Sequence, residues 1–311
     1  MQYRKIFDPG ITQVFAEHAA LPAADRGDRS VYVYTDEIVL AVNVALATGR
    51  PLLVRGPSGS GKSTLARNVA RTLGRRYYEQ VISSRTQARD LLWQIDLLRR
   101  LQDAQAKQLA PDFSRYVVPG VLWWAFDRAG ALQQLAQTTS DSSAAKEPGE
   151  FTGSSKAVVL LDEIDKADPD VPNNLLVPLG SLAFSVDETG QQVLAVDPPL
   201  VFLTTNDERD LPPAFIRRCV ELNIPSPSAE QLLTIGQAHF ANAPQDLLKN
   251  LAALFDAPSD GSPNPPSTAE YLDTVRACMQ LGVAPGAPLF ETLARVTVWK
   301  HGRTPGGRAL P

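Results

Sequence analysis

Apolar residues follow two patterns along this chain, one typical of buried strands and the other of amphipathic helices. Three short runs, at 51–55, 157–161 and 200–204, are apolar almost without interruption, as strands covered on both faces of a parallel sheet are. Helical spacing appears before the first of these strands, at 35–48, and between the strands, at 62–73 and 170–182. The pattern predicts an α/β fold in which helices cover a parallel sheet.

The remaining segments are more varied. We expect a strand over 77–82, a hairpin over 183–196, one long helix over 87–108, and a Ser/Thr/Gly-rich mobile loop over 137–155. The long helix would present Leu91, Leu92, Ile95, Leu98 and Leu101 on one side. After Pro225 the pattern becomes entirely helical, and we expect helices at 229–240, 245–255, 269–281 and 289–299.

These elements suggest three parts. Residues 1–30 form a short helix-bearing N-terminal arm, and 31–225 form the α/β core with an insertion at about 86–155. Residues 226–311 form a small all-α domain and tail. A chain of 311 residues is long enough for two domains of ordinary size.

Composition narrows the class of protein. The net charge of −4 and a pI near 5.5 give no general attraction to nucleic acid or to an anionic membrane. Cys219 and Cys278 are too few for a disulfide framework, and we expect ordinary thiols in a reducing, cytoplasmic setting. The first ten residues do not resemble a signal peptide, and no run approaches the ~20 apolar residues that span a bilayer.

The strongest chemical signal follows the strand at 51–55 and precedes the helix at 62–73. Residues 56–63 read GPSGSGKS, which satisfies G-x-x-x-x-G-K-[ST]. Glycines let successive backbone N–H groups face an anion, and the helix N-terminus adds its dipole. Lys62 is assigned to the β- and γ-phosphates of a nucleotide and the Ser63 hydroxyl to Mg²⁺. The full set of nucleotide-binding positions expected here is Gly56, Pro57, Ser58, Gly59, Ser60, Gly61, Lys62, Ser63 and Thr64.

A second signal lies about a hundred residues later. The buried strand at 157–161 ends in Asp162 and Glu163, which places two carboxylates at the carboxyl edge of the sheet. Asp162 is expected to orient Mg²⁺ through its water shell, and Glu163 to polarise the attacking water. Asp165 and Asp168 are expected to be solvated loop or helix-cap residues.

Two weaker signals follow in order. The strand at 200–204 leads to Asn206, whose amide could orient water or touch the γ-phosphate, although asparagine also favours turns. A short helix at 211–219 ends in Arg217 and Arg218. These arginines could make surface ion pairs of little energetic value, or one could reach into a neighbour's active site and accelerate phosphoryl transfer.

Together the four motifs resemble the Walker A, Walker B, sensor-1 and arginine-finger motifs of AAA+ ATPases, over roughly residues 31–300. Within that class the chain is most similar to the MoxR-type branch, which is related to magnesium chelatase and to the motor of McrBC. The segments that carry this resemblance are 50–56, 90–93, 120–125, the hairpin near Gly190 and the stretch 213–219.

The resemblance implies ATP and Mg²⁺ as cofactors, bound between the subunits of a homo-oligomeric ring, usually a hexamer. Arg218 matches the finger best, with Arg217 as its neighbour, and each would act in the next subunit. Backbone near Val33 and Tyr34 would meet the adenine. MoxR-type proteins usually act with a von Willebrand factor A-domain partner, which this chain does not itself contain.

One feature departs from the family pattern. The stretch 266–271 reads PSTAEY and lacks the sensor-2 arginine that many AAA+ proteins carry at the start of a lid helix. Arg276 comes two turns later. Coupling between the lid and the nucleotide state is therefore in question, and slow turnover fits this departure.

Two sets of side chains can be interpreted either as ordinary structural residues or as functional ones. Trp123 and Trp124 are either core residues or a substrate-gripping pair, because inserted loops face the pore in related rings. His18, His239 and His301 are isolated from one another, so the sequence indicates no histidine metal site.

Three functions compete. The first is a chaperone-like motor that remodels or activates a partner protein. The second is a nucleotide-operated switch or scaffold in a signalling or defence assembly, which the missing sensor-2 arginine favours. The third is a GTP-driven DNA motor like that of McrBC, which would need a basic pore that this composition does not indicate.

Overall fold

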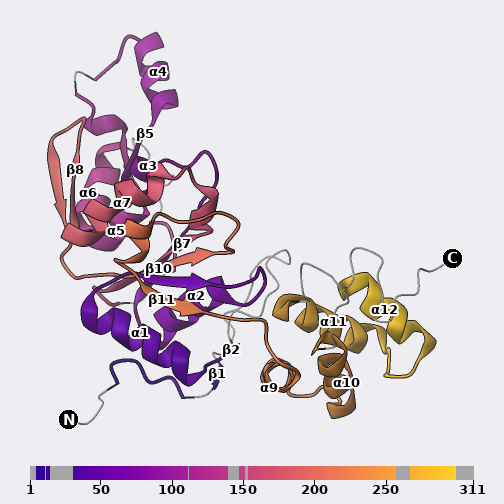
Figure 1. Cartoon of the computed structure of the whole chain (residues 1–311). Coiled ribbons are helices and arrows are strands. Elements are labelled where there is room, and N and C mark those ends of the chain that lie inside the picture. Colours follow the sequence, from indigo (N-terminus) through magenta and orange to yellow (C-terminus); the bar gives the residue numbers. More distant parts are fainter. Residues whose placement is uncertain are drawn as a thin grey trace, which may run out of the picture. The chain divides into compact units, whose positions relative to one another are not determined.

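The computed structural model describes residues 5–10, 12–14, 31–110, 112–138, 147–150, 153–256 and 267–298. They fall into two compact units (Figure 1). One contains Glu37–Val54 and Val69–Leu222 with a short N-terminal stretch. The other contains the described parts of Pro9–Asp36, Arg55–Asn68 and Asn223–Pro311. The domain limits at 31, 226 and 86–155 remain predictions.

A five-stranded parallel sheet organises the first unit, which confirms the predicted fold class. Its strands lie in the order β11-β3-β10-β7-β4. Both β10 and β4 pair in parallel with β7, and Phe202 lies opposite Leu160 in the β10–β7 register. The strands are β3 (Leu52–Arg55), β4 (Arg76–Val81), β7 (Ala157–Asp162), β10 (Leu200–Thr205) and β11 (Val220–Asn223). Sequence periodicity did not predict β11, a strand of four residues in which only Leu222 is buried.

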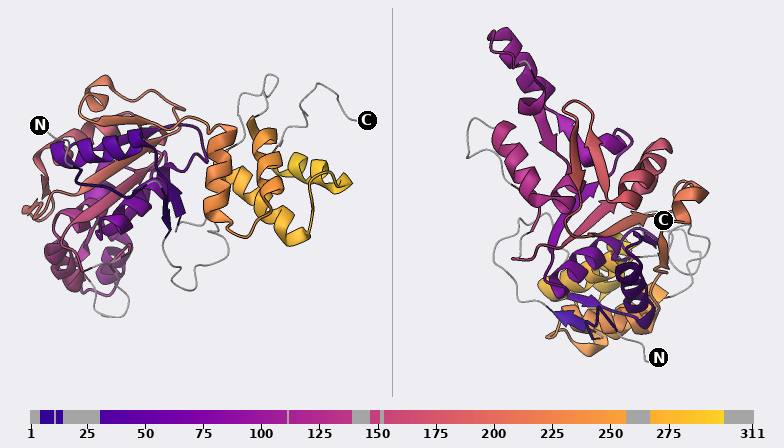
Figure 2. Two further views of the ribbon diagram at one scale, coloured as in Figure 1. Left: turned by 90° about the horizontal axis from the view of Figure 1, so that it is seen from below. Right: turned by 90° about the vertical axis from the view of Figure 1, so that its left-hand side faces the viewer.

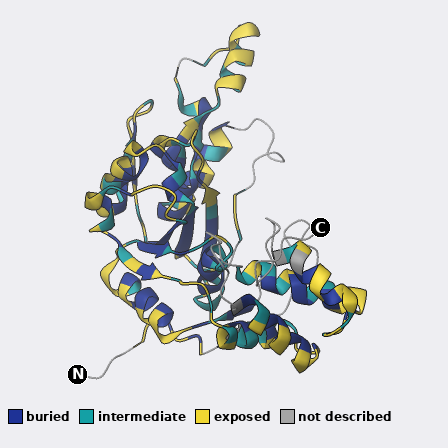
Figure 3. Cartoon of the chain, turned by 45° about the vertical axis from the view of Figure 1, so that its right-hand side comes forward, coloured by how far each residue is buried: buried dark blue, intermediate teal, exposed yellow. Residues whose placement is uncertain are grey.

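The sheet is buried because its central strands are apolar on both faces. Every residue of β10 and all but the last residue of β7 are buried, and Figure 3 shows the central strands in dark blue. Helices flank the sheet (Figures 1 and 2), and α5 contacts both β4 and β7. The flanking helices are α1 (Asp36–Thr48), α5 (Val121–Phe126), α6 (Arg128–Thr138) and α7 (Asp170–Ser181), whereas α2 (Lys62–Thr72) is divided between the two units.

The single helix predicted over 87–108 is wrong. The chain instead forms α3 (Ala88–Leu92), strand β5 (Trp93–Ile95) and α4 (Leu97–Gln105). The helical pattern is interrupted because β5 pairs antiparallel with β6 (Val117–Pro119), a contact that local periodicity does not reveal. The expected apolar side is also divided: Leu91 and Leu92 are buried in the core, whereas Leu98 and Leu101 on α4 are exposed.

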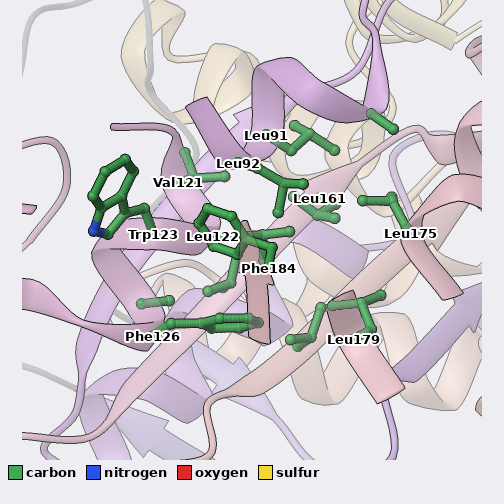
Figure 4. Close-up of a cluster of buried hydrophobic side chains, with 14 of the residues drawn as sticks. Leu91, Leu92, Val121, Leu122, Trp123, Phe126, Leu161, Leu175, Leu179 and Phe184 are labelled. Carbon is green, nitrogen blue, oxygen red and sulfur yellow. The ribbon is translucent and has the colours of Figure 1, made fainter. Parts of the chain in front are cut away.

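Both tryptophans of α5 lie in the hydrophobic core, as the core interpretation predicts. Trp123 and Trp124 are 0% and 2% exposed. Phe184 packs against Trp123 edge to face, with their ring centroids 5.9 Å apart, and Figure 4 shows both among buried leucines. Side chains this deeply buried within the subunit do not present a gripping surface to a substrate.

Replacing Trp123 by alanine is expected to destabilise the protein by about 3–5 kcal/mol, because it removes a fully buried aromatic side chain and leaves a cavity. The free energy of unfolding in urea measures the effect. The matched control is Val177→Ala on α7, whose side chain is 71% exposed and whose loss is expected to change stability by less than about 0.5 kcal/mol. Equal stability of the two variants would contradict the core assignment.

Two further expectations have mixed outcomes. The hairpin is present as β8 (Ala183–Val186) and β9 (Gln191–Leu194). Most of the N-terminal arm and the centre of the 137–155 loop lie outside the described residues. Where the arm is described, β1 (Thr12–Val14) pairs antiparallel with β2 (Val31–Val33), neither of which was predicted.

The second unit contains the predicted helices of the C-terminal region: α9 (Ala229–His239), α10 (Gln245–Asp256), α11 (Thr268–Leu281) and α12 (Pro288–Val298). They enclose their own apolar cluster, in which the rings of Phe255 and Tyr271 meet edge to face at 5.5 Å. Burial raises the pKa of Tyr271 to about 12. Ser228 and Ser267 each accept a hydrogen bond from the first turn of the following helix, which is how a capping box fixes a helix start.

Candidate functional site

The glycine-rich loop connects β3 to α2, in the strand–loop–helix order that a phosphate-binding loop requires. Lys62 is the first residue of α2 and is only 6% exposed. Its ammonium group donates to the Gly56 and Pro57 carbonyl oxygens, each at 2.8 Å. The lysine thus lies folded over the loop, where a phosphate would compete with these carbonyls for the same charge.

Two glycines are required by close approaches within the second unit. Gly56 has a φ of 147°, and a Cβ there would collide with the Ile224 carbonyl oxygen. Gly59 has a φ of 76°, and its Cβ would lie 2.6 Å from Ser267 Oγ. Only glycine fits both the backbone angle and the space. The loop therefore needs glycine at both positions to keep its backbone this close to Ile224 and Ser267.

Gly56→Ala is expected to destabilise the chain by at least about 1–3 kcal/mol, since it adds backbone strain and displaces the Ile224 carbonyl. That carbonyl cannot move freely, because the Ile224 N–H donates to Arg55 O at 2.8 Å. Thermal unfolding checks the prediction. Gly180→Ala on α7 is the control: a Cβ there meets nothing within 4 Å, and alanine favours a helix. A Gly56→Ala protein as stable as this control would contradict the geometry.

The acidic pair Asp162 and Glu163 lies at the carboxyl end of β7 in the first unit, beside the carboxyl end of β10. Thr204 of β10 connects its members: its hydroxyl donates to Asp162 Oδ1 and accepts from the Glu163 N–H at 2.8 Å. Asn206, just after β10, donates its side-chain amide to Glu163 Oε1 at 3.3 Å. The structure thus brings Asn206 to Asp162 and Glu163, from which it is separated by more than forty positions in the sequence.

Glu163 has an unusual backbone. Its φ of 61° and ψ of 48° place it in the left-handed region, which costs a residue with a side chain on the order of 1–2 kcal/mol. Lys166 pairs with its carboxylate at 2.9 Å, and this hydrogen bond raises the pKa of Lys166, so the lysine stays cationic. Glu163 is therefore held from two sides, by the Asn206 amide and by the Lys166 ammonium group.

Asp165 differs from its expected role. It is 2% exposed, and its Oδ2 accepts the Glu208 N–H at 3.0 Å. The expectation of a solvated residue is wrong because the turn Ile164–Lys166 packs against β10 and points this carboxylate inward. Asp168 is exposed and accepts the Asp170 N–H at the start of α7, as a helix-cap residue would.

Arg217 and Arg218 follow the short helix α8 (Pro213–Ile216) and are both exposed. The Arg218 guanidinium donates to the Ala214 carbonyl at 3.1 Å. Neither side chain forms an ion pair with an acidic group of the described residues. Their role as a finger in a neighbouring subunit stays a prediction.

The residues assigned to adenine lie in the second unit. Val33 ends β2, with Thr12 opposite it in the ladder. Tyr34 is 5% exposed, and its hydroxyl donates to Asn68 Oδ1 at 2.7 Å. This bond attaches the end of β2 to α2, the helix that begins at Lys62. The adenine contacts themselves remain a prediction.

Helix α11 contacts the glycine loop through its backbone and not through an arginine. The Ala269 N–H donates to the Gly59 carbonyl at 3.2 Å, within the same unit. Arg276 instead pairs with Asp273 at 2.8 Å and lies over the Phe240 ring. The start of this helix therefore meets the loop through its backbone at the place where many AAA+ proteins have a sensor-2 side chain.

Three residues at these sites were not among the predicted functional residues. Thr204 and Lys166 support the acidic pair, and Arg50 contacts the segment that bears the two arginines. Lys166 could have been found from its i, i+3 spacing to Glu163, and Thr204 from its place as a polar residue in an apolar strand. Arg50 carries no such local signal.

A nucleotide and Mg²⁺ fit the residues present. The glycine loop before α2, the buried Lys62 and the Ser63 hydroxyl have the chemistry of a phosphate and metal site. No group of three or more His, Cys, Asp or Glu side chains suited to a metal is found in the part of the chain that the structure describes. His18 and His301 lie outside that part, and the Cys219 and Cys278 side chains are both buried.

The fold and these motifs define a P-loop protein of the AAA+ class. Residues 51–219, more than half of the chain, match the family described as AAA domain (dynein-related subfamily). The chain belongs to this family of AAA+ ATPases. The MoxR-type branch is a finer assignment and is taken up as a proposal below.

Comparisons with curated proteins and with solved structures do not narrow the family assignment further. No curated protein matches the chain. Among solved structures, a point mutant of RuvB from Thermotoga maritima is 15% identical, with a TM-score of 0.47 over 84% of this chain and 68% of that one. A likeness this distant carries no argument about substrate or partner.

Among the described helices, none combines the length and the apolar character needed to cross a bilayer.

Proposed function

We propose that this chain hydrolyses ATP with Mg²⁺ in a homo-oligomeric ring, and that it remodels or activates a separate partner protein as a MoxR-type ATPase. The observation that carries the hydrolytic part is the network around Glu163. A carboxylate held between an amide and an ammonium group at the end of a buried strand is oriented as a water-activating base should be.

The roles follow from the chemistry of each group. Lys62 and the loop backbone hold phosphate, and Ser63 and Asp162 hold the metal, which when bound supplies positive charge against the phosphate oxygens. Glu163 accepts a proton from water, and Asn206 orients Glu163. Arg218, with Arg217 beside it, contributes its charge to the neighbouring subunit's site.

The partner is proposed on resemblance alone. A von Willebrand factor A-domain protein is the expected class, and DNA is disfavoured by the net charge of −4. Cytoplasmic location belongs to the same proposal.

A second function is favoured by one specific observation. The start of α11 meets Gly59 through its backbone, and Arg276 is engaged with Asp273. A lid without a charged sensor suits a slow switch whose occupancy, rather than turnover, carries the signal.

The mass of the Glu163→Gln protein in solution, with and without Mg-ATP, tests the proposal. We expect a nucleotide-dependent shift from monomer to a hexamer, because a finger acting in trans needs a neighbour. Wild-type protein with ADP is the control. A chain that binds ATP yet stays monomeric at every concentration would contradict the homo-oligomeric ring and favour the switch.

A further inference from the structure

The guanidinium group of Arg50 binds three consecutive backbone carbonyls of the segment that carries the two exposed arginines. Its Nε donates to Arg218 O at 3.1 Å. Its Nη2 donates to Arg217 O and to Cys219 O, each at 2.6 Å. All of these residues lie in the same compact unit, although they are separated by more than 165 positions in the sequence.

These carbonyls need a donor because of where they lie. They belong to the three residues that directly follow helix α8, which ends at Ile216, so no further helical turn is present to supply donors. Charged donors bind about twice as strongly as neutral ones. Arg50 therefore serves as a long-range cap for the segment Arg217–Cys219.

A second contact fixes the same segment just beyond the arginines. The Val220 N–H donates to the Pro51 carbonyl at 2.8 Å, which starts the pairing of β11 with β3. The side chain of Arg50 and the backbone of Pro51 thus hold both sides of Cys219. The Arg218 backbone is anchored, while its guanidinium remains exposed.

We infer that Arg50 is a positioning residue for the arginine finger: it fixes the backbone of Arg217 and Arg218 so that Arg218 reaches the neighbouring subunit's site in the geometry that phosphoryl transfer needs. This inference rests on the proposed function. Arg50 also lies just before β3, whose other end continues into the glycine loop. Strand β3 therefore lies in the sequence between the residue that holds the Arg218 backbone and the phosphate loop of the same subunit.

The test uses oligomers mixed from two kinds of subunit. One kind, the lending subunit, supplies Arg218 to its neighbour's site, and the other, the accepting subunit, hydrolyses ATP. Glu163→Gln subunits lend a finger but cannot turn over, and Arg218→Ala subunits turn over only when a neighbour lends one. Adding Arg50→Ala to the lending subunit is expected to lower the kcat recovered by the mixture roughly 10²-fold, with KM unchanged, because misplacement of about 1 Å costs that much.

The same substitution in the accepting subunit is the matched comparison. There Arg50→Ala accompanies Arg218→Ala, the finger is already absent, and the recovered rate is expected to equal that of the simple mixture. A folding defect or a role of Arg50 in its own subunit's site would instead lower the rate in this arrangement, and that result would overturn the inference. Arg50→Lys in the lending subunit is expected to rescue in part, since one ammonium group replaces a fork that spans three carbonyls.

Unchanged stability is checked by thermal unfolding of each variant, and Arg115→Ala, which removes another exposed arginine of the same unit, controls for charge. If Arg50→Ala does not fold, Arg50→Lys and Arg50→Gln carry the test. Full recovery with an Arg50-substituted lender would overturn the role of Arg50 alone. A fully active Arg218→Ala homo-oligomer would overturn the finger, and with it this inference.

Discussion

Glu163→Gln is expected to lower the rate of ATP turnover by about 10²- to 10⁴-fold while the nucleotide stays bound. Glutamine has the same shape and can still accept the Asn206 amide on its oxygen, so the loop should keep its form. It cannot accept a proton from water, and it no longer offers a carboxylate to Lys166. The base is lost, whereas the phosphate-binding loop at Lys62 is untouched.

Phosphate release and binding of a fluorescent ATP analogue measure the two quantities separately. Glu208→Gln is the matched control, because it removes one carboxylate whose residue is exposed near the same strand end and should leave turnover within about twofold. Lys62→Ala is the second comparison, and this variant is expected to lose binding of the ATP analogue. Wild-type turnover by Glu163→Gln would show that the base lies elsewhere.

Arg218→Ala is expected to lower turnover by about 10³-fold or more in a pure oligomer, since an arginine finger supplies that much to phosphoryl transfer. The physical reason is charge: the guanidinium stabilises negative charge that grows on the transferring phosphate only in the transition state. Nucleotide binding to the isolated subunit should be unchanged, because the side chain serves another subunit's site.

Mixing distinguishes this role from a structural one. Glu163→Gln subunits, themselves inactive, should restore turnover when added to Arg218→Ala subunits. Arg217→Ala, measured in the same series, is expected to lose less, because Arg218 matches the finger position best. A mixing series with no recovery at any ratio would remove the finger role from Arg218.

These predictions separate the motor from the switch. A fast wild-type rate that depends on Glu163 and Arg218 supports a motor. A slow rate with tight binding supports a switch, and the backbone contact between Ala269 and Gly59 would then be the route by which the lid senses the loop. Direct comparison of ATP with GTP, with and without DNA, addresses the McrB-like alternative.

Local chemistry predicted much of the fold and many of the site candidates. The glycine loop could be found from its own residues, because a phosphate cradle needs glycines, a lysine and a helix start in immediate succession. The central strands could be found because strands buried on both faces must be apolar throughout. Asp162 and Asn206 could be found because each lies where such a strand ends.

Other features depend on contacts between distant segments. Strand β5 interrupts a leucine-rich helical pattern because β6 lies beside it, and nothing within 87–108 indicates that partner. The tryptophans could be placed in the core only once Phe184 and the buried leucines were seen around them. Asp165 is buried because its turn packs on β10, which its neighbours in the sequence do not show.

The sequence by itself determined that this chain has a phosphate-binding loop, two acidic residues at a strand end and a parallel sheet, since each is written in consecutive residues. Only the tertiary structure decided what supports them. Thr204 connects Asp162 to Glu163, and Arg50 caps the segment of Arg218, through hydrogen bonds that span about 40 and 168 positions of the chain. Local sequence patterns indicate which face of a helix or strand is buried. Which distant residues contact that face depends on the tertiary fold.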